Sequence, residues 1–513
     1  VADPARMSGY RYDRAHLSDA GTPLAVVKPA TTAEVQTVVR IAAAHRTPII
    51  VRGAGTSLAG GSTARDGAIT LSTERMRAIA VDPSTRTAVV QPGLLNAEVK
   101  AAAKEHGLWY PPDPSSYEIC SIGGNIATNA GGLCCVKYGV TTDYILGMTV
   151  VLADGTAVDL GGPWLKNTAG LSLTKLFVGS EGTLGIVTSA TLRLVPAQPP
   201  ASTVVGTFPD VVACSRAVLA ITRRTRPAML EFMDNVSIRA VEADLRMGLD
   251  TTAGAMLLAQ SDLPGPDRAA EAEFMAQAFR DHGATEVFTT DDPDEGEQFT
   301  VARRAAFTSL GKIGTLLLED VGVPLPALPD LVAGIEAISA ARDVPIALVA
   351  HAGDGNTHPI IVYDAADPDW HDLDVTVIDA HEHLPPEREL TSQKADVFTR
   401  LYAHYSLTNV ETAGLAGARE LLKDTSRPQD ERWAMFRPYL AAVQDTGYAR
   451  AAQIAARDLF GVDEINDDTY ADLSERIARA EQPADRCTRQ GDSGRSGADE
   501  TRLSVPGPPS LRR

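Results

Sequence analysis

Three loops rich in glycine are the residues of this chain best suited to bind a ligand with phosphate groups. They span residues 52–61, 121–132 and 179–188. Successive glycines let backbone N–H groups point toward one anion, and they let a bulky ligand approach the main chain. An ordinary glycine turn is the alternative interpretation of a single such loop. Three of them within one part of the chain predict a long ligand that lies across a single domain.

A Rossmann interpretation of the first loop fails at one position. Gly53 and Gly55 match the start of a G-x-G-x-x-G motif, and Glu74 lies near the expected distance for the acidic residue that binds ribose. Leu58 stands where the third glycine belongs. The loops therefore indicate a different nucleotide-binding arrangement.

Two histidines form a second group with possible chemistry. His351 and His358 lie at the ends of the segment H-A-G-D-G-N-T-H, directly after an apolar segment at 345–350. Two imidazoles around a glycine turn can bind one divalent metal ion. Two histidines that only support the turn are an equally good interpretation of the residues alone.

The elements that must carry these residues follow from local patterns. Thr31 and Glu34 form a T-x-x-E capping box before apolar residues at helical spacing. We expect strands at 48–52, 88–91, 148–152 and 185–194. These elements predict an α+β domain over residues 1–198. A joint rich in proline at 197–202 leads into mixed strands and alanine-rich helices, which predict a second domain over residues 199–365.

The composition excludes several classes of protein. The net charge of −19 argues against nucleic acid as a partner. Five cysteines, with Cys134 and Cys135 adjacent, form no disulfide framework and predict a reducing cytoplasm. We expect no transmembrane segment and no signal sequence, because no apolar run approaches the roughly 18 residues that a bilayer requires. Since Val1 is not a methionine, we expect the natural chain to begin upstream.

The loop motifs closely resemble the PCMH-type FAD-binding domain of the vanillyl-alcohol oxidase superfamily. The motifs are P-x-x-x-R-G-x-G-T-S at 48–57, P-P-D-P-S-S at 111–116, G-G-N-x-A-T-N-A-G-G at 123–132 and G-S-E-G-T-L-G-I-V-T at 179–188. From Asp13 to Asp364, the chain is similar to the branch that contains the glycolate oxidase large subunit and D-lactate dehydrogenase. This resemblance implies a two-subdomain FAD-binding domain, a cap domain with an antiparallel sheet, and FAD bound without a covalent link.

The resemblance also implies which residues hold the cofactor. The first loop would wrap the pyrophosphate, the next two motifs would line the flavin and the ribityl chain, and the last would approach the adenine. These residues are Arg52, Gly53, Ala54, Gly55, Thr56, Ser57, Pro112, Pro114, Ser116, Gly123, Gly124, Asn125, Thr128, Asn129, Glu181, Gly182, Gly185, Ile186 and Val187.

For the substrate, the resemblance implies an arginine and a metal ion. Arg303 matches the position at which relatives hold a carboxylate, although Phe299 stands where a tryptophan is common. We expect its neighbour Arg304 at the surface. His351 and His358 would bind a divalent metal, Zn or Mn, that grips the carboxylate and 2-hydroxyl of the substrate. The implied reaction is hydride transfer from the 2-carbon of a hydroxy acid to the flavin.

One expected segment is missing. Relatives take the catalytic base and the last metal ligand from a G-E-H-G segment, but here the region reads E-L-T-S-Q-K at 389–394, and G-E-H-G occurs nowhere. The catalytic base is therefore unknown. The gap leaves open whether this chain completes the oxidation or has an impaired reaction.

Beyond Asp364 the sequence changes character. An apolar strand that ends in H-x-H at His381 and His383 resembles the opening of an amidohydrolase-superfamily barrel, over residues 373–482. Such a barrel needs about 250 residues, whereas only residues 384–513 follow. A complete hydrolase cannot fit. We expect a mostly helical segment at 366–482 and a disordered tail at 483–513.

Two hypotheses explain this change. The chain is either a flavoenzyme joined to the first part of a hydrolase, or it has a helical domain in which His381, Glu382 or His383 replaces the missing groups. The sequence favours FAD-dependent oxidation of a small 2-hydroxy acid such as glycolate or D-lactate. A metal-dependent hydrolase fragment and an inactive FAD-binding protein are the alternatives. The electron acceptor (quinone, oxygen or a partner subunit) and the oligomeric state stay open.

Overall fold

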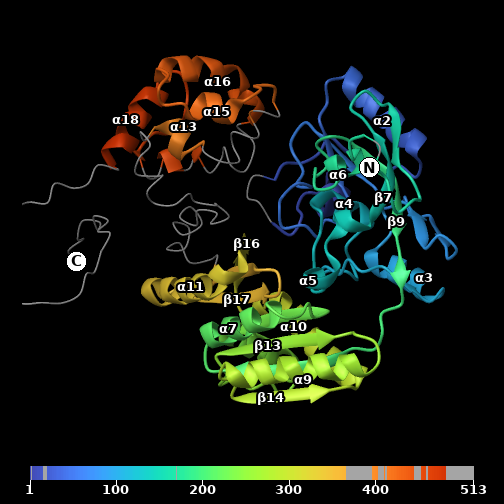
Figure 1. Ribbon diagram of the computed structural model, residues 1–513. Coiled ribbons are helices and arrows are strands. Elements are labelled where there is room, and N and C mark those ends of the chain that lie inside the picture. The colour runs from blue at the N-terminus through green and yellow to red at the C-terminus, as the bar shows by residue number, and fades with distance from the viewer. Residues whose placement is uncertain are drawn as a thin grey trace, which may run out of the picture. The chain divides into compact units, whose positions relative to one another are not determined.

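The computed structural model describes residues 1, 3–15, 20–168, 170–364, 396–402, 410, 413–443, 452–453, 455–457 and 460–480. Contacts divide the chain into two compact units, Val1–His381 and Glu382–Arg513 (Figure 1). The first unit contains the N-terminal domain and the cap domain, which follow one another along the chain. The segments at 365–395 and 481–513 lie outside the described residues, and with them the H-x-H pair, residues 389–394 and the expected tail.

The N-terminal domain is built on two main sheets. A parallel sheet has the order β1-β3-β2, and an antiparallel sheet has the order β4-β5-β9-β7-β8. A short pair, β6 with β10, closes the domain near its end. The strands are β1 Ala25–Val27, β2 Ile49–Arg52, β3 Ile69–Ser72, β4 Ile79–Asp82, β5 Thr87–Val90, β6 Leu108–Trp109, β7 Ile145–Val151, β8 Ala157–Gly161, β9 Ile186–Arg193 and β10 Val195–Pro196.

Helices precede and connect these strands. They are α1 Pro4–Met7, η1 Ser8–Tyr10, α2 Thr32–Ala44, α3 Asn96–Lys104, α4 Ile122–Thr128, α5 Cys135–Tyr138, η2 Thr141–Tyr144 and α6 Leu173–Phe177. Half of the predicted capping box is present, because Thr31 Oγ1 accepts a hydrogen bond from Glu34 N at 3.2 Å. The Glu34 carboxylate accepts from Ala30 N at 2.7 Å rather than from the backbone N–H of the cap residue Thr31. Strand β2 then ends where the first glycine loop begins.

The cap domain is one large antiparallel sheet covered by helices (Figure 1). Its strand order is β14-β11-β13-β12-β17-β18-β15, and β16 also pairs with β18. The strands are β11 Ser202–Phe208, β12 Met229–Asp234, β13 Ala255–Ser261, β14 Glu286–Thr290, β15 Thr315–Leu318, β16 Val321–Gly322, β17 Ile346–His351 and β18 Asn356–Tyr363. The helices are α7 Val211–Thr222, α8 Asn235–Leu245, α9 Pro266–Asp281, α10 Pro293–Leu310, η3 Leu325–Ala327 and α11 Leu328–Arg342.

Both faces of the cap sheet are buried, each against a different set of helices. Side chains of α7, α9 and α11 pack on one face together with Phe232 and Leu348. Side chains of α8 and α10 pack on the other face together with Met233 and Val349. Because successive residues of a strand point to opposite faces, every strand residue can be assigned to a face from this pattern. The face covered by α10 also contacts Leu133 of the N-terminal domain.

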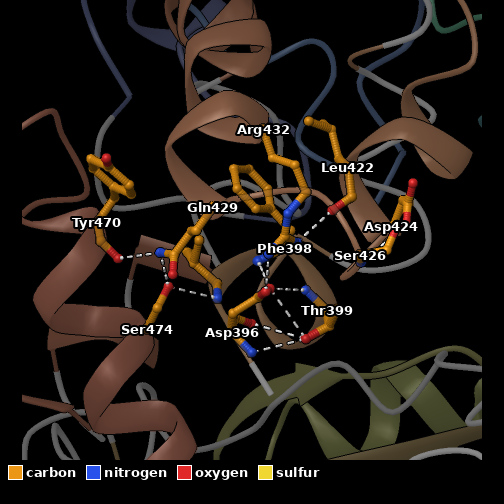
Figure 2. A network of polar contacts seen from close by, with 11 residues as sticks. Asp396, Phe398, Thr399, Leu422, Asp424, Ser426, Gln429, Arg432, Tyr470 and Ser474 are labelled. Carbon is orange, nitrogen blue, oxygen red and sulfur yellow. Dashed lines mark hydrogen bonds and ion pairs between the residues drawn. The ribbon is translucent and has the colours of Figure 1, made fainter. Parts of the chain in front are cut away.

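The second unit is helical in its described part and has its own core. Its helices include α13 Val397–Arg400, α15 Ala418–Lys423, α16 Gln429–Val443 and α18 Tyr470–Ala480. Trp433, Phe436 and Leu473 are among the buried residues that pack together. Figure 2 shows a buried network in this unit, in which Asp396 accepts from Thr399 N at 3.0 Å and pairs with Arg432 at 2.5 Å.

The predicted fold class is confirmed. An α+β N-terminal domain precedes a cap domain with an antiparallel sheet and a helical C-terminal region. In the part of the chain that the structure describes, no helix combines the length and the apolar character required to cross a membrane.

Candidate active site

The glycine loops line one pocket in the N-terminal domain. Its walls enclose about 990 Å³ of space, part of which opens to solvent. The wall includes these predicted cofactor residues: Gly53, Ala54, Gly55, Thr56, Ser57, Pro114, Ser116, Gly123, Gly124, Asn125, Thr128, Glu181, Gly182, Gly185 and Val187.

A single hydroxyl joins the first loop to the second. Ser121 caps α4, and its Oγ accepts hydrogen bonds from Gly124 N and Ala54 N, each at 3.2 Å. Gly53 makes this approach possible, because a Cβ at that position would lie 2.4 Å from Ser121 Oγ. The first loop can therefore reach α4 only while residue 53 has no side chain.

The third loop is held to the same helix by its main chain. Gly179 N donates to Ile126 O and Glu181 N donates to Ala127 O, each at 2.9 Å. Glu181 has a positive φ of 49° and Gly182 one of 78°, which turns the chain sharply at this contact. Helix α4, which belongs to the second loop, is therefore the common support to which the first and third loops are fixed.

The pocket would bind a phosphate through backbone groups rather than through cations. Among the described residues that form its wall there is no lysine or arginine. Arg52 lies behind the first loop, where its Nη1 donates to Tyr12 O at 2.9 Å. Burial lowers the pKa of Arg52, and the carboxylate of Asp13 opposes that shift. Clustered N–H groups in glycine loops bind anions in this way.

Glu181 is the acidic group on the pocket wall. Burial raises the pKa of its carboxyl group, and the nearby charge of Asp13 adds to the increase. A carboxylate here repels phosphate oxygens but can accept hydrogen bonds from hydroxyl or amino groups. The end of the pocket at Glu181 therefore suits the sugar or base of a nucleotide better than its phosphates.

Four predicted cofactor residues lie outside the wall. Arg52 supports the first loop, and Pro112 O accepts a hydrogen bond from Asn96 Nδ2 at 3.2 Å. Asn129 ends α4 and accepts from Thr142 N at 2.9 Å. Ile186 is buried in the core beneath the third loop. These residues hold the shape of the loops and have no direct place in the pocket.

The predicted substrate residues meet on one face of the cap sheet. Strand register pairs Phe232 with Ala350, and Val349 with His358. The period of two then places Glu231, His351 and His358 on the face that α10 covers. Arg303 extends from α10 toward the same place. The arginine and both histidines that were predicted to bind substrate and metal therefore lie on the same face of the cap sheet.

Glu231 is the centre of this group. Its carboxylate lies 2.8 Å from His351 Nδ1 and 2.9 Å from Arg303 Nη2. The Glu231 and Arg303 side chains are 1% and 5% exposed. Burial of a charged pair is stable only when each charge has a close partner. The glutamate therefore fixes the position of the arginine and the orientation of one histidine. We call Glu231, Arg303, His351 and His358 the cap cluster.

Two polar atoms of the cap cluster are buried without a hydrogen bond. Among the described residues, Arg303 Nε has no hydrogen-bond partner, and neither has His358 Nδ1, which lies 3.9 Å from Asp320 Oδ1. Burial lowers the pKa of His358 well below its ordinary value, and the charges of His351 and Arg303 act in the same direction. Buried polar groups in proteins are nearly always paired. The two atoms are therefore available to a polar ligand that enters beside them.

The two histidines alone do not make a metal site. Their ring centroids are 5.1 Å apart, and His351 Nδ1 is already engaged by Glu231. No group of three or more His, Cys, Asp or Glu side chains suitable for a metal ion occurs in the described part of the chain. The expected Zn or Mn ion finds no support among these residues, because a catalytic site for such an ion generally requires three protein ligands.

Arg304 is not at the surface, contrary to the expectation. It pairs with Asp113, which lies between Pro112 and Pro114 in the N-terminal domain. Lys100 Nζ contacts the same carboxylate at 2.7 Å. Burial by itself would raise the pKa of Asp113, but the charges of Lys100 and Arg304 lower it overall. The helix that carries Arg303 is thus ionically bonded to the turn that lines the pocket.

Sequence reasoning missed three residues of this arrangement. Ser121 was part of a glycine motif and caps α4 locally, but its hydrogen bond from Ala54 N joins residues 67 positions apart. Glu231 offered a signal, because it interrupts the apolar strand M-L-E-F-M and a buried carboxylate requires a partner. Asp113 was within a recognised motif, yet its partner lies 191 residues further along the chain.

Comparison with known proteins agrees with this geometry. A family model described as "FAD binding domain" matches residues 23–161, and one described as "FAD linked oxidases, C-terminal domain" matches residues 198–383. The glycolate oxidase subunit GlcD of Bacillus subtilis is 40% identical over 350 residues, which cover 68% of this chain and 74% of that protein. The chain belongs to the FAD-linked oxidase family.

Other members of the FAD-linked oxidase family are similarly related. A D-lactate dehydrogenase of Archaeoglobus fulgidus is 32% identical, with 65% of this chain and 74% of that protein covered. A D-2-hydroxyglutarate dehydrogenase of Xanthomonas citri is 33% identical, with 66% and 72% covered. The structure of p-cresol methylhydroxylase shares the fold, with a TM-score of 0.62, 17% identity and 91% and 94% of the two chains covered. The chain is therefore an FAD-linked oxidoreductase by family.

Proposed function

We propose that this chain binds FAD in the glycine-loop pocket and oxidises a small 2-hydroxy acid of the glycolate or D-lactate type. The observation that carries the proposal is the pair of buried atoms that make no hydrogen bond, Arg303 Nε and His358 Nδ1, on one face of the cap sheet. Relatives named for glycolate, D-lactate and D-2-hydroxyglutarate support the class of substrate. FAD, when bound, supplies the acceptor for the hydride that leaves the 2-carbon.

Different residues of the chain would bind the cofactor and the substrate. Backbone groups at 53–57 and 123–128 would hold the cofactor without a covalent bond, and Glu181 would accept from its hydroxyl or amino groups. Arg303 would bind the substrate carboxylate, since a guanidinium that keeps free N–H groups matches a carboxylate in shape and charge. Glu231 keeps that guanidinium in place. His358, held neutral by its surroundings, would hydrogen-bond the 2-hydroxyl.

The cap cluster lies next to residues that continue the second loop. Val136 contacts Gly353, where a Cβ would lie 2.7 Å from Val136 Cγ2. Leu133 and Cys134 are buried in the same core as Met233 and Val349. The chain is thus packed continuously from the wall of the pocket to the cap cluster, which supports a substrate bound near the cofactor.

An absorption spectrum with substrate tests the proposal. Purified full-length protein should show flavin peaks near about 375 and 450 nm that bleach on anaerobic addition of glycolate or D-lactate. Peaks that do not bleach with a panel of 2-hydroxy acids would support an inactive FAD-binding protein. A colourless protein that cannot be reconstituted with FAD would contradict the proposal altogether.

An Arg303→Lys variant sharpens the test. Lysine keeps the positive charge but loses the fork of the guanidinium, so we expect normal flavin content and a KM for the hydroxy acid raised by about 10- to 100-fold. Arg280→Lys, in an exposed ion pair with Glu273, is the matched control and should leave KM unchanged. An unchanged KM in Arg303→Lys would exclude this arginine as the carboxylate anchor.

The segment that follows the cap domain bears on the missing base. The match to the FAD-linked oxidase C-terminal domain extends to residue 383, so it includes His381 and His383. This supports the hypothesis of a helical domain with replacement groups over that of a flavoenzyme joined to part of a hydrolase. If His381 or His383 supplies a missing group, His383→Ala should lower the metal content and the rate of bleaching together. Equal metal content in the variant and the parent would contradict the replacement.

A further inference from the structure

Two consecutive arginines of α10 reach into different domains. Arg303 pairs with Glu231 in the cap sheet, whereas Arg304 pairs with Asp113 in the N-terminal domain. Neighbouring residues of a helix point about 100° apart, so one helix turn can engage both partners at once. The side chains of Arg304 and Asp113 are 16% and 9% exposed, so solvent screens this pair only weakly.

Asp113 is held rigidly on its own side. Prolines flank it at 112 and 114, and both restrict the backbone. Its carbonyl oxygen accepts from Leu133 N at 3.3 Å, and a Cβ at Gly132 would lie only 2.0 Å from that oxygen. Its carboxylate also binds Lys100 of α3 at 2.7 Å. The N-terminal domain therefore holds this carboxylate by contacts of its own, in addition to the ion pair with Arg304.

Arg304 is directed toward this carboxylate by its other contacts as well. Its guanidinium carbon lies 4.9 Å from the centre of the Tyr117 ring, which belongs to the same segment as Pro114 and Ser116. Pro114 and Ser116 line the flavin pocket. Any displacement of Arg304 would therefore weaken both its ion pair and its contact with an aromatic ring of the pocket-lining segment.

We propose that Arg304 and Asp113 are positioning residues that set the location of Arg303 relative to the flavin pocket. The pair acts through α10, because the backbone of residue 304 cannot move without moving residue 303. The inference rests on the proposed function, in which Arg303 binds the substrate carboxylate. It adds that the distance between Arg303 and the cofactor is fixed by the ion pair between the two domains, and not by the cap domain alone.

Binding of oxalate to the full-length protein tests this inference. Oxalate has the carboxylate groups of a substrate but no hydrogen on carbon to transfer, so its binding can be followed as a perturbation of the flavin spectrum. We expect Arg304→Gln and Asp113→Asn to retain FAD but to weaken oxalate binding by about tenfold or more, since small misplacement of a binding group is costly. The double variant should be no weaker than the worse single variant.

Three further variants separate positioning from general stability. Arg304→Lys keeps a cation beside Asp113 and should recover part of the affinity, and it also serves if Arg304→Gln does not fold. Lys312→Gln removes an ion pair with Asp244 that lies within the cap domain, and it should bind oxalate normally. Asp262→Asn weakens another link between the domains, in which Asp262 pairs with Lys137 and bonds Tyr138.

The outcomes are distinct. If Arg304→Gln binds oxalate like the parent, or if Asp262→Asn weakens binding as much as Arg304→Gln does, the positioning role is wrong. If the parent protein holds FAD but neither binds oxalate nor bleaches with any hydroxy acid, the proposed function fails and this inference fails with it. A loss of oxalate affinity confined to Arg304→Gln and Asp113→Asn supports the positioning role of the pair. In these variants the KM for the hydroxy acid should rise by a larger factor than kcat falls.

Discussion

The flavin pocket and the cap cluster bind their ligands with opposite kinds of residue. The pocket is made of main chain and small side chains from three loops, and the first and third loops are both held to α4 of the second. The cap cluster is made of a buried ion pair and two histidines, and Glu231 holds Arg303 and His351 through its carboxylate. The pocket should therefore be sensitive to added bulk, and the cap cluster to lost charge.

The largest effect that this comparison predicts is in the pocket. Gly53→Val places a branched side chain where a Cβ is already 2.4 Å from Ser121 Oγ, so the first loop must leave α4. We expect loss of most bound FAD, measured as the ratio of absorbance at 450 nm to protein. Gly334→Ala is the control, because nothing lies within 4 Å of its Cβ. Normal flavin content in Gly53→Val would contradict the predicted sensitivity of the pocket to added bulk.

In the cap cluster the predicted effect is on stability. Glu231→Gln leaves Arg303 buried without a countercharge, which costs about 3–5 kcal/mol when one partner of a buried pair is removed. Chemical denaturation should show this loss as a lower midpoint for the cap domain. The control is Glu273→Gln, since the exposed pair with Arg280 contributes about 0–1 kcal/mol. Equal losses in both variants would contradict the role of Glu231.

The helical unit offers a third place to test the effect of buried charge. Arg432→Met removes the partner of Asp396, but that carboxylate keeps its hydrogen bonds from Phe398 N and Thr399 N. We expect a smaller loss, about 1.5–3 kcal/mol for a hydrogen bond to a charged group. Unfolding followed by tryptophan fluorescence, which includes Trp433 of this unit, measures it. Loss of FAD in the same variant would contradict the separation of the two units.

The smallest predicted effect depends on pH. Burial raises the pKa of Asp234, the cap of α8, to about 6, from an ordinary value of 3.8. Its contribution to stability is therefore complete below pH 3.8 and is lost as the pH rises through about 6. Asp234→Asn should have a higher melting temperature than the parent, and this difference should be larger at pH 7.5 than at pH 5. Asp210→Asn, at the exposed cap of α7, is the control. A gain in Asp234→Asn that is the same at both pH values would contradict the explanation.

The two regions also differ in how far the sequence could predict them. Local patterns were sufficient for Thr31 and Glu34, whose capping interaction spans only a few residues. The pocket loops could be recognised because each one carries its own glycines. The partners of Glu231 and Asp113 could not, because an ion pair between distant segments leaves no periodic pattern in either of them. Arg304 was assigned to the surface for the same reason.

The network at Ser121 has a consequence for how the cofactor enters. Its hydroxyl accepts from both loops, so contacts within the protein itself hold the walls of the pocket together. The conformational entropy of these loops is then lost during folding and not during association. Uptake of FAD by the apoprotein should accordingly be a simple bimolecular event, without a slow refolding phase, and removal of the flavin should be reversible.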